Sequence, residues 1–92
     1  MKKYLPVGSI VKLKNEDQLI MIIGYSFIVK LKQFFGYDYF GCYYPEGVIE
    51  LEKNILFRHE DIENIFYMGY NSKKIKKINA LNNILMRGNN DE

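Results

Sequence analysis

The fragment with the most enzyme-like residue types is His59-Glu60-Asp61-Ile62, which contains the only histidine of the chain. A His-Glu pair begins the zinc motif of many metalloproteases, in which a second histidine follows on the same helix. Without that second histidine, a zinc site would rely on distant carboxylates, which are a poor ligand set for this metal. We therefore interpret the fragment as a helical turn whose acidic side chains accept backbone N–H groups, while His59 satisfies a neighbouring carbonyl.

Cys42 is the only cysteine, which excludes an intrachain disulfide and a zinc site of the multi-cysteine kind. It lies between Gly41 and Tyr43 in a strand-like run, so a buried structural thiol is the simplest interpretation. The sequence contains neither a serine in a nucleophile elbow nor a Gly-rich phosphate-binding loop. We expect a protein that is not an enzyme and that binds no cofactor and no metal.

Aromatic residues make up 15% of the chain, and a domain of this size cannot bury all of their rings on both faces of its strands. Exposed rings are what a protein-binding surface requires, whereas the simpler alternative is that they fill a barrel core. Two turns with polar tips are the candidate partner-binding sites. Their residues are Tyr43, Tyr44, Pro45 and Glu46 in the first turn, and His59 and Glu60 in the second.

The elements that would position these turns are short strands. Alternating or continuous apolar runs predict strands over 9–14, 19–25, 37–44, 48–50 and 65–70, while 26–32 continues the second strand or starts another. Gly24 and Gly41 suggest bulges, and Pro45-Glu46-Gly47 predicts a tight turn. Phe57 and Ile62 are expected to point inward. The result is a small curled antiparallel sheet of about five strands, on the scale of an SH3-like barrel.

A helix is expected after the last strand. Asn71-Ser72 is suited to an N-cap, apolar residues recur at helical spacing from Ile75 to Leu85, and Gly88 suits a C-terminal stop. The predicted class is therefore α+β. With 92 residues and 48% hydrophobic residues, the chain forms one domain over 1–92, with a sheet core at about 4–70 and an amphipathic helix at about 72–87.

Charge and hydropathy narrow the possible partners and the compartment. The net charge is +2, and the sequence pI of about 8.6 is below that expected of a dedicated nucleic-acid binder. Four lysines between 73 and 77 could contact phosphates, but acidic residues are spread through the predicted barrel. Leu19–Ile23 is far shorter than the roughly 20 residues of a membrane helix. With no signal peptide and one free thiol, a cytoplasmic location without membrane contact is expected.

Several fragments occur together in a fixed order, and each is weak alone. They are Tyr4-Leu5-Pro6-Val7-Gly8-Ser9-Ile10-Val11, Met21-Ile22-Ile23-Gly24, Tyr37-Asp38-Tyr39, Tyr43-Tyr44-Pro45-Glu46-Gly47, Leu56-Phe57-Arg58-His59-Glu60-Asp61-Ile62 and Phe66-Tyr67-Met68-Gly69-Tyr70. This set resembles a family of small Bacillota proteins encoded in type VII (Ess/ESX-like) secretion loci, commonly beside LXG-type toxins. The resemblance covers residue 4 to about residue 70.

The resemblance implies no catalytic residues, but it implies a cytoplasmic accessory or chaperone-like protein that holds a secreted LXG-type effector before export. A small sheet with surplus aromatic rings and a free edge is compatible with that role. Two alternatives remain open: a small nucleic-acid-binding barrel with a basic helical tail, and an immunity protein for a neighbouring toxin. The sequence leaves the oligomeric state open.

Overall fold

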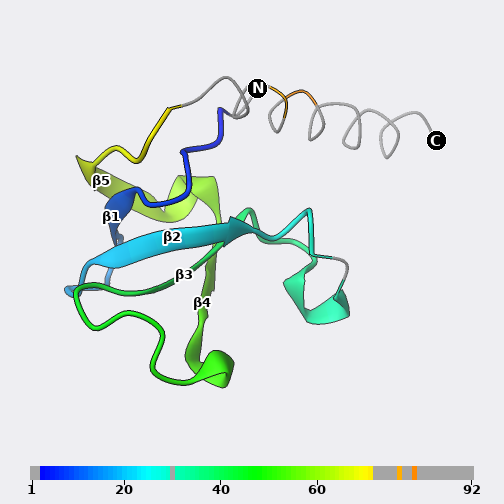
Figure 1. Ribbon diagram of the computed structural model, residues 1–92, viewed down its shortest axis with the longest axis horizontal. Coiled ribbons are helices and arrows are strands. Elements are labelled where there is room, and N and C mark those ends of the chain that lie inside the picture. The colour runs from blue at the N-terminus through cyan, green and yellow to red at the C-terminus, as the bar shows by residue number, and fades with distance from the viewer. Residues whose placement is uncertain (1–2, 30, 72–76, 78–79, 81–92) are drawn as a thin grey trace.

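The protein is described by a computed structural model that covers residues 3–29 and 31–71, together with residues 77 and 80. Five strands form one antiparallel sheet in the order β4-β3-β2-β1-β5 (Figure 1). The strands are β1 (Ile10–Leu13), β2 (Ile20–Tyr25), β3 (Tyr39–Tyr43), β4 (Ile55–Phe57) and β5 (Ile62–Tyr67). Three single 3₁₀ turns connect them: η1 (Lys32–Phe34), η2 (Leu51–Lys53) and η3 (His59–Asp61).

The first two strands follow the hydrophobic pattern of the sequence. In β1 the side chains of Val11 and Leu13 are buried, whereas those of Ile10 and Lys12 are half-buried, as period-two alternation requires. Strand β2 lies between β1 and β3 and pairs with both. Its pairing with β3 shifts register between Ile22 and Gly24, so the bulge expected at Gly24 is confirmed.

Gly41 in β3 has a different role from the bulge that we expected there. A Cβ atom at this position would lie 2.6 Å from the carbonyl oxygen of Met21 and 2.7 Å from Cγ2 of Ile20. The absence of a side chain therefore lets β2 and β3 approach closely. The turn at Pro45-Glu46-Gly47 is confirmed, with Gly47 at a φ of +81°.

The partner of β3 on its other side was predicted wrongly. Residues 48–50 form no strand, and the chain makes only a single bridge from Tyr43 to Gly47 before η2. Ile55–Phe57 pairs with β3 instead, with Tyr39 opposite Phe57 and Gly41 opposite Ile55. A run of three apolar residues is too short to show a hydrophobic period, so the sequence does not identify it as a strand. Its pairing is determined by contacts with residues distant in the sequence, which bury Phe57.

The core lies on one face of this sheet and is rich in rings. Its buried members are Tyr4, Leu5, Val11, Leu13, Ile20, Ile22, Tyr25, Tyr39 and Phe57, with Phe27, Tyr43, Ile55 and Ile62 packed against it. Tyr39 and Phe57 stack with their ring centroids 5.3 Å apart. The inward orientation expected of Phe57 is confirmed. A contact of this kind adds about 0.5–1.5 kcal/mol to what area burial alone contributes.

The predicted α+β class is wrong for residues 3–29 and 31–71, which form five strands and three 3₁₀ turns without an α-helix. The antiparallel sheet is consistent with the small β-barrel part of that prediction. The amphipathic helix expected at about 72–87 falls outside the described residues, apart from the two isolated positions 77 and 80. Among the described residues, no helix is long and apolar enough to cross a membrane.

Candidate functional site

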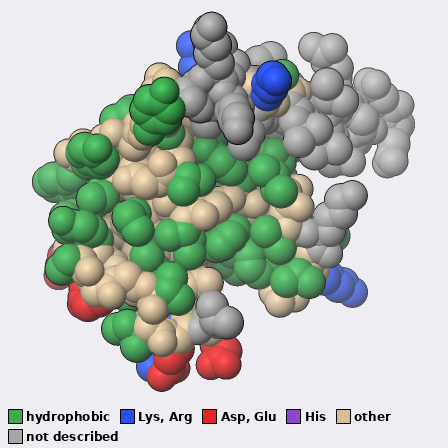
Figure 2. All heavy atoms as spheres, viewed as in Figure 1, with side chains coloured by type: hydrophobic (Ala, Val, Ile, Leu, Met, Phe, Trp, Pro, Cys, Tyr) green, Lys and Arg blue, Asp and Glu red, His purple; other side chains and the backbone are tan. Residues whose placement is uncertain are grey.

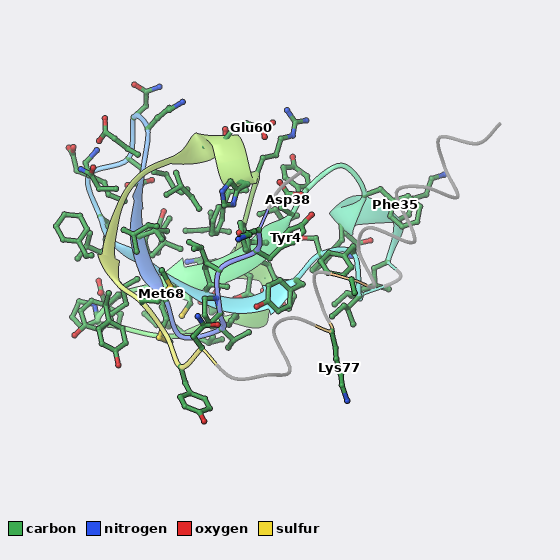
Figure 3. All side chains as sticks on the ribbon, turned by 90° about the horizontal axis from the view of Figure 1, so that it is seen from above. Tyr4, Phe35, Asp38, Glu60, Met68 and Lys77 are labelled. Carbon is green, nitrogen blue, oxygen red and sulfur yellow. The ribbon has the colours of Figure 1, made fainter. Side chains whose placement is uncertain are left out.

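Asp38 connects three parts of the chain at the beginning of β3. The Tyr4 hydroxyl donates a hydrogen bond of 2.8 Å to Oδ1 of Asp38, and the backbone N–H of His59 donates one of 2.7 Å to Oδ2. Figure 3 shows Tyr4 and Asp38 side by side beneath η3, which carries Glu60. The carboxylate thus joins the N-terminal segment to the turn between β4 and β5.

Tyr39 extends this network into the core. Its hydroxyl accepts a hydrogen bond of 3.0 Å from the backbone N–H of Leu5 and lies 2.7 Å from Nδ1 of His59. The Tyr25 hydroxyl donates to the carbonyl oxygen of Leu5 at 2.7 Å. Burial strongly raises the pKa of the Tyr39 phenol, so this group is neutral and acts as a hydrogen-bonding partner rather than as a base.

The enzyme-like fragment therefore has a structural explanation, with one correction. We expected His59 to satisfy a backbone carbonyl, whereas its ring is hydrogen-bonded to the Tyr39 hydroxyl. The expected role of an acidic side chain is confirmed, because Oδ2 of Asp61 accepts the backbone N–H of Arg58 at 2.9 Å. No three His, Cys, Asp or Glu side chains gather into a metal-binding group in the part of the chain that the structure describes.

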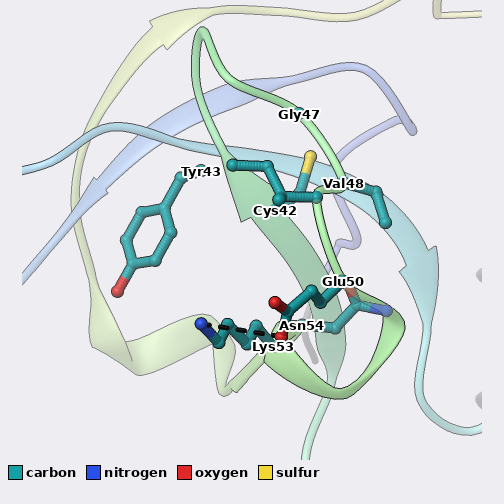
Figure 4. A pocket seen from close by; sticks show the side chains of 8 residues that line it. Cys42, Tyr43, Gly47, Val48, Glu50, Lys53 and Asn54 are labelled. Atoms are coloured by element: carbon teal, nitrogen blue, oxygen red, sulfur yellow. Dashed lines mark ion pairs between the residues drawn. The ribbon is translucent and has the colours of Figure 1, made fainter.

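A small pocket lies at the other end of β3, beneath the loop that leads to β4 (Figure 4). Its volume is about 70 Å³, and its lining is mostly apolar. The lining residues are Cys42, Tyr43, Gly47, Val48, Ile49, Glu50, Lys53 and Asn54. An engineered dry cavity of about 150 Å³ binds benzene, so this pocket is of a size to take one small aliphatic group.

The rim of the pocket combines apolar side chains with one ion pair. Ile49 is 75% exposed and Val48 48% exposed, so both offer apolar surface beside the pocket that they line. On another side, Nζ of Lys53 lies 3.6 Å from Oε2 of Glu50, and Figure 4 marks this pair. At the base of the pocket the Cys42 side chain is buried, and burial raises the pKa of its thiol.

The structure separates the six residues predicted to bind a partner into two groups. Tyr43 and Tyr44 lie at the end of β3 that borders the pocket, with Pro45 and Glu46 in the turn that follows. His59 and Glu60 lie on η3, where His59 meets Tyr39 at the beginning of β3. The two ends of this strand are roughly 13 Å apart, from four steps of about 3.3 Å.

Within the first group the side chains differ in accessibility. Tyr43 is half-buried and packs against the core, whereas Tyr44 is exposed. The Glu46 carboxylate accepts a hydrogen bond of 2.7 Å from Nε2 of Gln18, which ties the turn to the loop between β1 and β2. Of the two tyrosines, Tyr44 is therefore the one that a partner could contact.

Sequence reasoning missed Val48 and Ile49, which were assigned to a strand of their own. It also missed a second exposed apolar surface along β5 and the segment that follows, although 65–70 was identified as a strand. Figure 2 shows hydrophobic side chains spread over much of one face of the molecule. The sequence shows that apolar residues are in excess of what the core can bury, but it does not show which of them remain exposed in the folded protein.

The fold and the pocket define a small antiparallel β-sheet protein with a small apolar pocket at one end of the inner strand β3. Residues 4–78 match the model of a family described as "Domain of unknown function (DUF4176)", and the chain belongs to that family. The matched range contains the whole described sheet, both turns and the pocket. No curated protein and no solved structure matches the chain significantly.

Proposed function

We propose that this protein is a non-enzymatic accessory protein that binds another polypeptide, a secreted LXG-type effector of a type VII secretion system, in the cytoplasm. The observation that carries the proposal is the apolar pocket with exposed Val48 and Ile49 on its rim. The secretion context comes from the sequence resemblance. The geometry supports the narrower part of the proposal, which is that a protein partner contacts this end of the sheet.

The pocket suits an anchoring side chain rather than a free metabolite. Binding sites for small molecules enclose several hundred Å³ and present a few convergent polar groups, whereas this pocket is small and mostly apolar. Protein interfaces concentrate binding energy in a few apolar anchors that enter pockets surrounded by a rim. A branched aliphatic side chain of the partner would fill the space beside Cys42 and contact Val48 and Ile49, while Tyr44, exposed one residue beyond the pocket-lining Tyr43, would contact the partner at the edge of this surface.

Nucleic-acid binding is less well supported by this surface. Bases stack on exposed aromatic rings within a basic groove, but the pocket rim carries Glu50 ion-paired to Lys53 and has no excess of positive charge. The charge around the pocket is therefore balanced, which favours an apolar segment of a protein.

The experiment is co-expression of the tagged protein with an LXG-type effector, followed by affinity purification. The test variants are Ile49→Asp and Tyr44→Ala, both at exposed positions. We expect Ile49→Asp to reduce the captured effector at least tenfold and Tyr44→Ala to reduce it several-fold, with thermal melts within about 3 °C of the wild type. Phe35→Asp is the matched control, because Phe35 is 68% exposed, close to the 75% of Ile49, and lies on a different loop.

The part of the effector that is captured separates the alternatives. Binding of its N-terminal targeting region supports the accessory role, and binding of its C-terminal toxic domain would replace it with an immunity role. If Ile49→Asp and Phe35→Asp capture the same amount as the wild type, the pocket is not the binding surface. An absorbance ratio showing nucleic acid bound at low salt and lost at high salt would favour the nucleic-acid alternative.

A further inference from the structure

A second apolar surface lies along the edge strand β5 and the chain that follows it. We call it the β5 patch; its residues are Val7, Ile65, Phe66, Tyr67, Met68 and Tyr70. All are exposed, with Phe66 at 60% and Tyr67 at 59%. Val7 belongs to the patch because a Cβ atom at Gly69 would lie 2.5 Å from its carbonyl oxygen. A contiguous apolar surface of this kind on a small protein usually marks an interaction site.

The register of β5 brings two consecutive rings together on a strand whose residues Glu63 to Tyr67 are all exposed. Val11 pairs with Ile65 and Ile10 with Tyr67, so Phe66 is an extra residue on β5 without a partner on β1. A second extra residue, Glu63, lies between the pairs Lys12–Asn64 and Leu13–Ile62. A bulge breaks the strict alternation of side chains and turns neighbouring residues toward the same side, which places Phe66 beside Tyr67 on the surface.

The same two bulges determine how the patch can be used. Bulges bend an edge strand and interrupt its ladder of backbone groups, which makes it a poor template for an added strand. A strand added along the free edge of β5 would find regular backbone geometry only at Asn64 and Ile65, because a bulge lies on each side of this pair. Contact through the side chains of the β5 patch has no such restriction. A molecule bound at the patch therefore packs against the aromatic side chains rather than extending the sheet.

The charge of the surface favours a second copy of the chain as this occupant. A two-fold interface places a patch against itself, so an unbalanced charge would repel its own copy. None of the six residues is charged, and the only charged residue of β5, Glu63, is ion-paired with Lys12 of the same chain at 2.6 Å. Aromatic side chains and Met are also the residues enriched at the centre of protein interfaces.

We propose that two copies of this protein associate through the β5 patch and form a closed dimer with two-fold symmetry. The proposal is independent of the proposed function, because the β5 patch and the pocket share no residue, and β1 and β2 lie between β5 and β3 in the sheet. Such a dimer would carry two pockets, one on each copy. It would therefore present two equivalent binding surfaces to its partner.

The test is the mass of the full chain in solution, measured by sedimentation equilibrium over a hundredfold range of concentration. The wild type should approach twice the 10.9 kDa of the single chain as concentration rises. Phe66→Lys places a charge where the patch meets its own copy, so its dimer dissociation constant should increase at least tenfold. Phe35→Lys is the control, since Phe35 is similarly exposed and lies on the opposite side of the molecule from Met68 (Figure 3); its dimer should be unchanged.

A wild type that remains a monomer at all concentrations would overturn the proposal, even if the patch captured a different protein. A dimer that Phe66→Lys leaves intact would overturn it as well.

Circular dichroism checks that the variant is folded, and Tyr70→Lys, at a position 85% exposed, repeats the test if Phe66→Lys unfolds. A dimer that dissociates on addition of 1 M NaCl would be electrostatic and would contradict an apolar interface. Ile49→Asp should keep the dimer while losing the effector, which separates this proposal from the previous one.

Discussion

The hydroxyl oxygen of Tyr39 lies 2.7 Å from Nδ1 of His59, and this contact joins the centre of the sheet to the turn before its last strand. The same oxygen accepts the backbone N–H of Leu5, so its one proton is available to the imidazole nitrogen. The histidine that looked most like a catalytic residue is thus held by a neutral, buried phenol.

Removing this hydroxyl should destabilise the fold without changing its packing. Tyr39→Phe keeps the stacked ring but leaves the buried N–H of Leu5 without its acceptor, which costs about 1–3 kcal/mol. We expect that loss in the free energy of unfolding measured with urea. Tyr44→Phe removes a hydroxyl from an exposed ring and serves as the control, with a change below about 0.5 kcal/mol. Equal stabilities of the two variants would show that the Tyr39 network contributes nothing.

The sequence predicted four of the five strands because each has a hydrophobic pattern of its own. Val11 and Leu13 alternate with Ile10, Lys12 and Lys14 in a period of two, and the run that became β2 is apolar enough for a strand between two others. Ile55–Phe57 was missed because a three-residue strand has no readable period. Its place is decided by Phe57 stacking on Tyr39 across the sheet, a contact between residues far apart in sequence.

The candidate site was only partly predictable, for a similar reason. Composition predicts that some rings must be exposed, and Tyr44, Phe66, Tyr67 and Tyr70 are. Which rings are exposed depends on the place of their strand in the sheet: on the edge strand β5, all residues from Glu63 to Tyr67 are exposed, Phe66 and Tyr67 among them. Tyr43 and His59, two of the residues predicted to bind a partner, are half-buried and lie at opposite ends of β3, where Tyr43 lines the pocket and His59 is hydrogen-bonded to Tyr39.

A methyl group at Gly41 should be among the most damaging small changes. In Gly41→Ala the new Cβ would lie 2.6 Å from the carbonyl oxygen of Met21, and backbone on the central strand β2 cannot move away cheaply. We expect a loss of about 1–3 kcal/mol or more in urea unfolding. Gly36→Ala meets no atom within 4 Å, although its φ is +90°, so it should cost only backbone strain of about 1–2 kcal/mol. The idea is wrong if Gly36→Ala costs more than Gly41→Ala.

Stability should fall at alkaline pH because burial raises the pKa of both Tyr25 and Tyr39. A raised pKa means that the folded protein keeps protons which the unfolded chain releases above about pH 10, so the stabilisation present below that pH is lost as pH rises. Burial also raises the pKa of Cys42, and its contribution declines from about pH 9 by the same reasoning. Urea unfolding between pH 8 and pH 11 measures the slope.

The variant Tyr39→Phe provides the control for this titration. Above pH 10 its stability should fall less steeply than that of the wild type, by up to about 1.4 kcal/mol per pH unit. The ultraviolet absorbance of tyrosinate should show that Tyr25 and Tyr39 keep their protons to a higher pH in the folded protein than in denaturing urea. Identical slopes for variant and wild type would exclude Tyr39 as a contributor.

Cys42 should react slowly with thiol reagents although it borders a pocket. Its side chain is only 3% exposed and burial raises its pKa, so both access and the thiolate fraction are low. We expect labelling by a chromogenic disulfide at pH 8 to be at least about a hundredfold slower in buffer than in denaturing urea. Tyr44→Cys in a Cys42→Ala background provides an exposed thiol two residues away and should react at nearly the denatured rate. If Cys42 reacted as fast as that control, the loop over the pocket would open freely, and the pocket could not hold a partner's side chain in a fixed position.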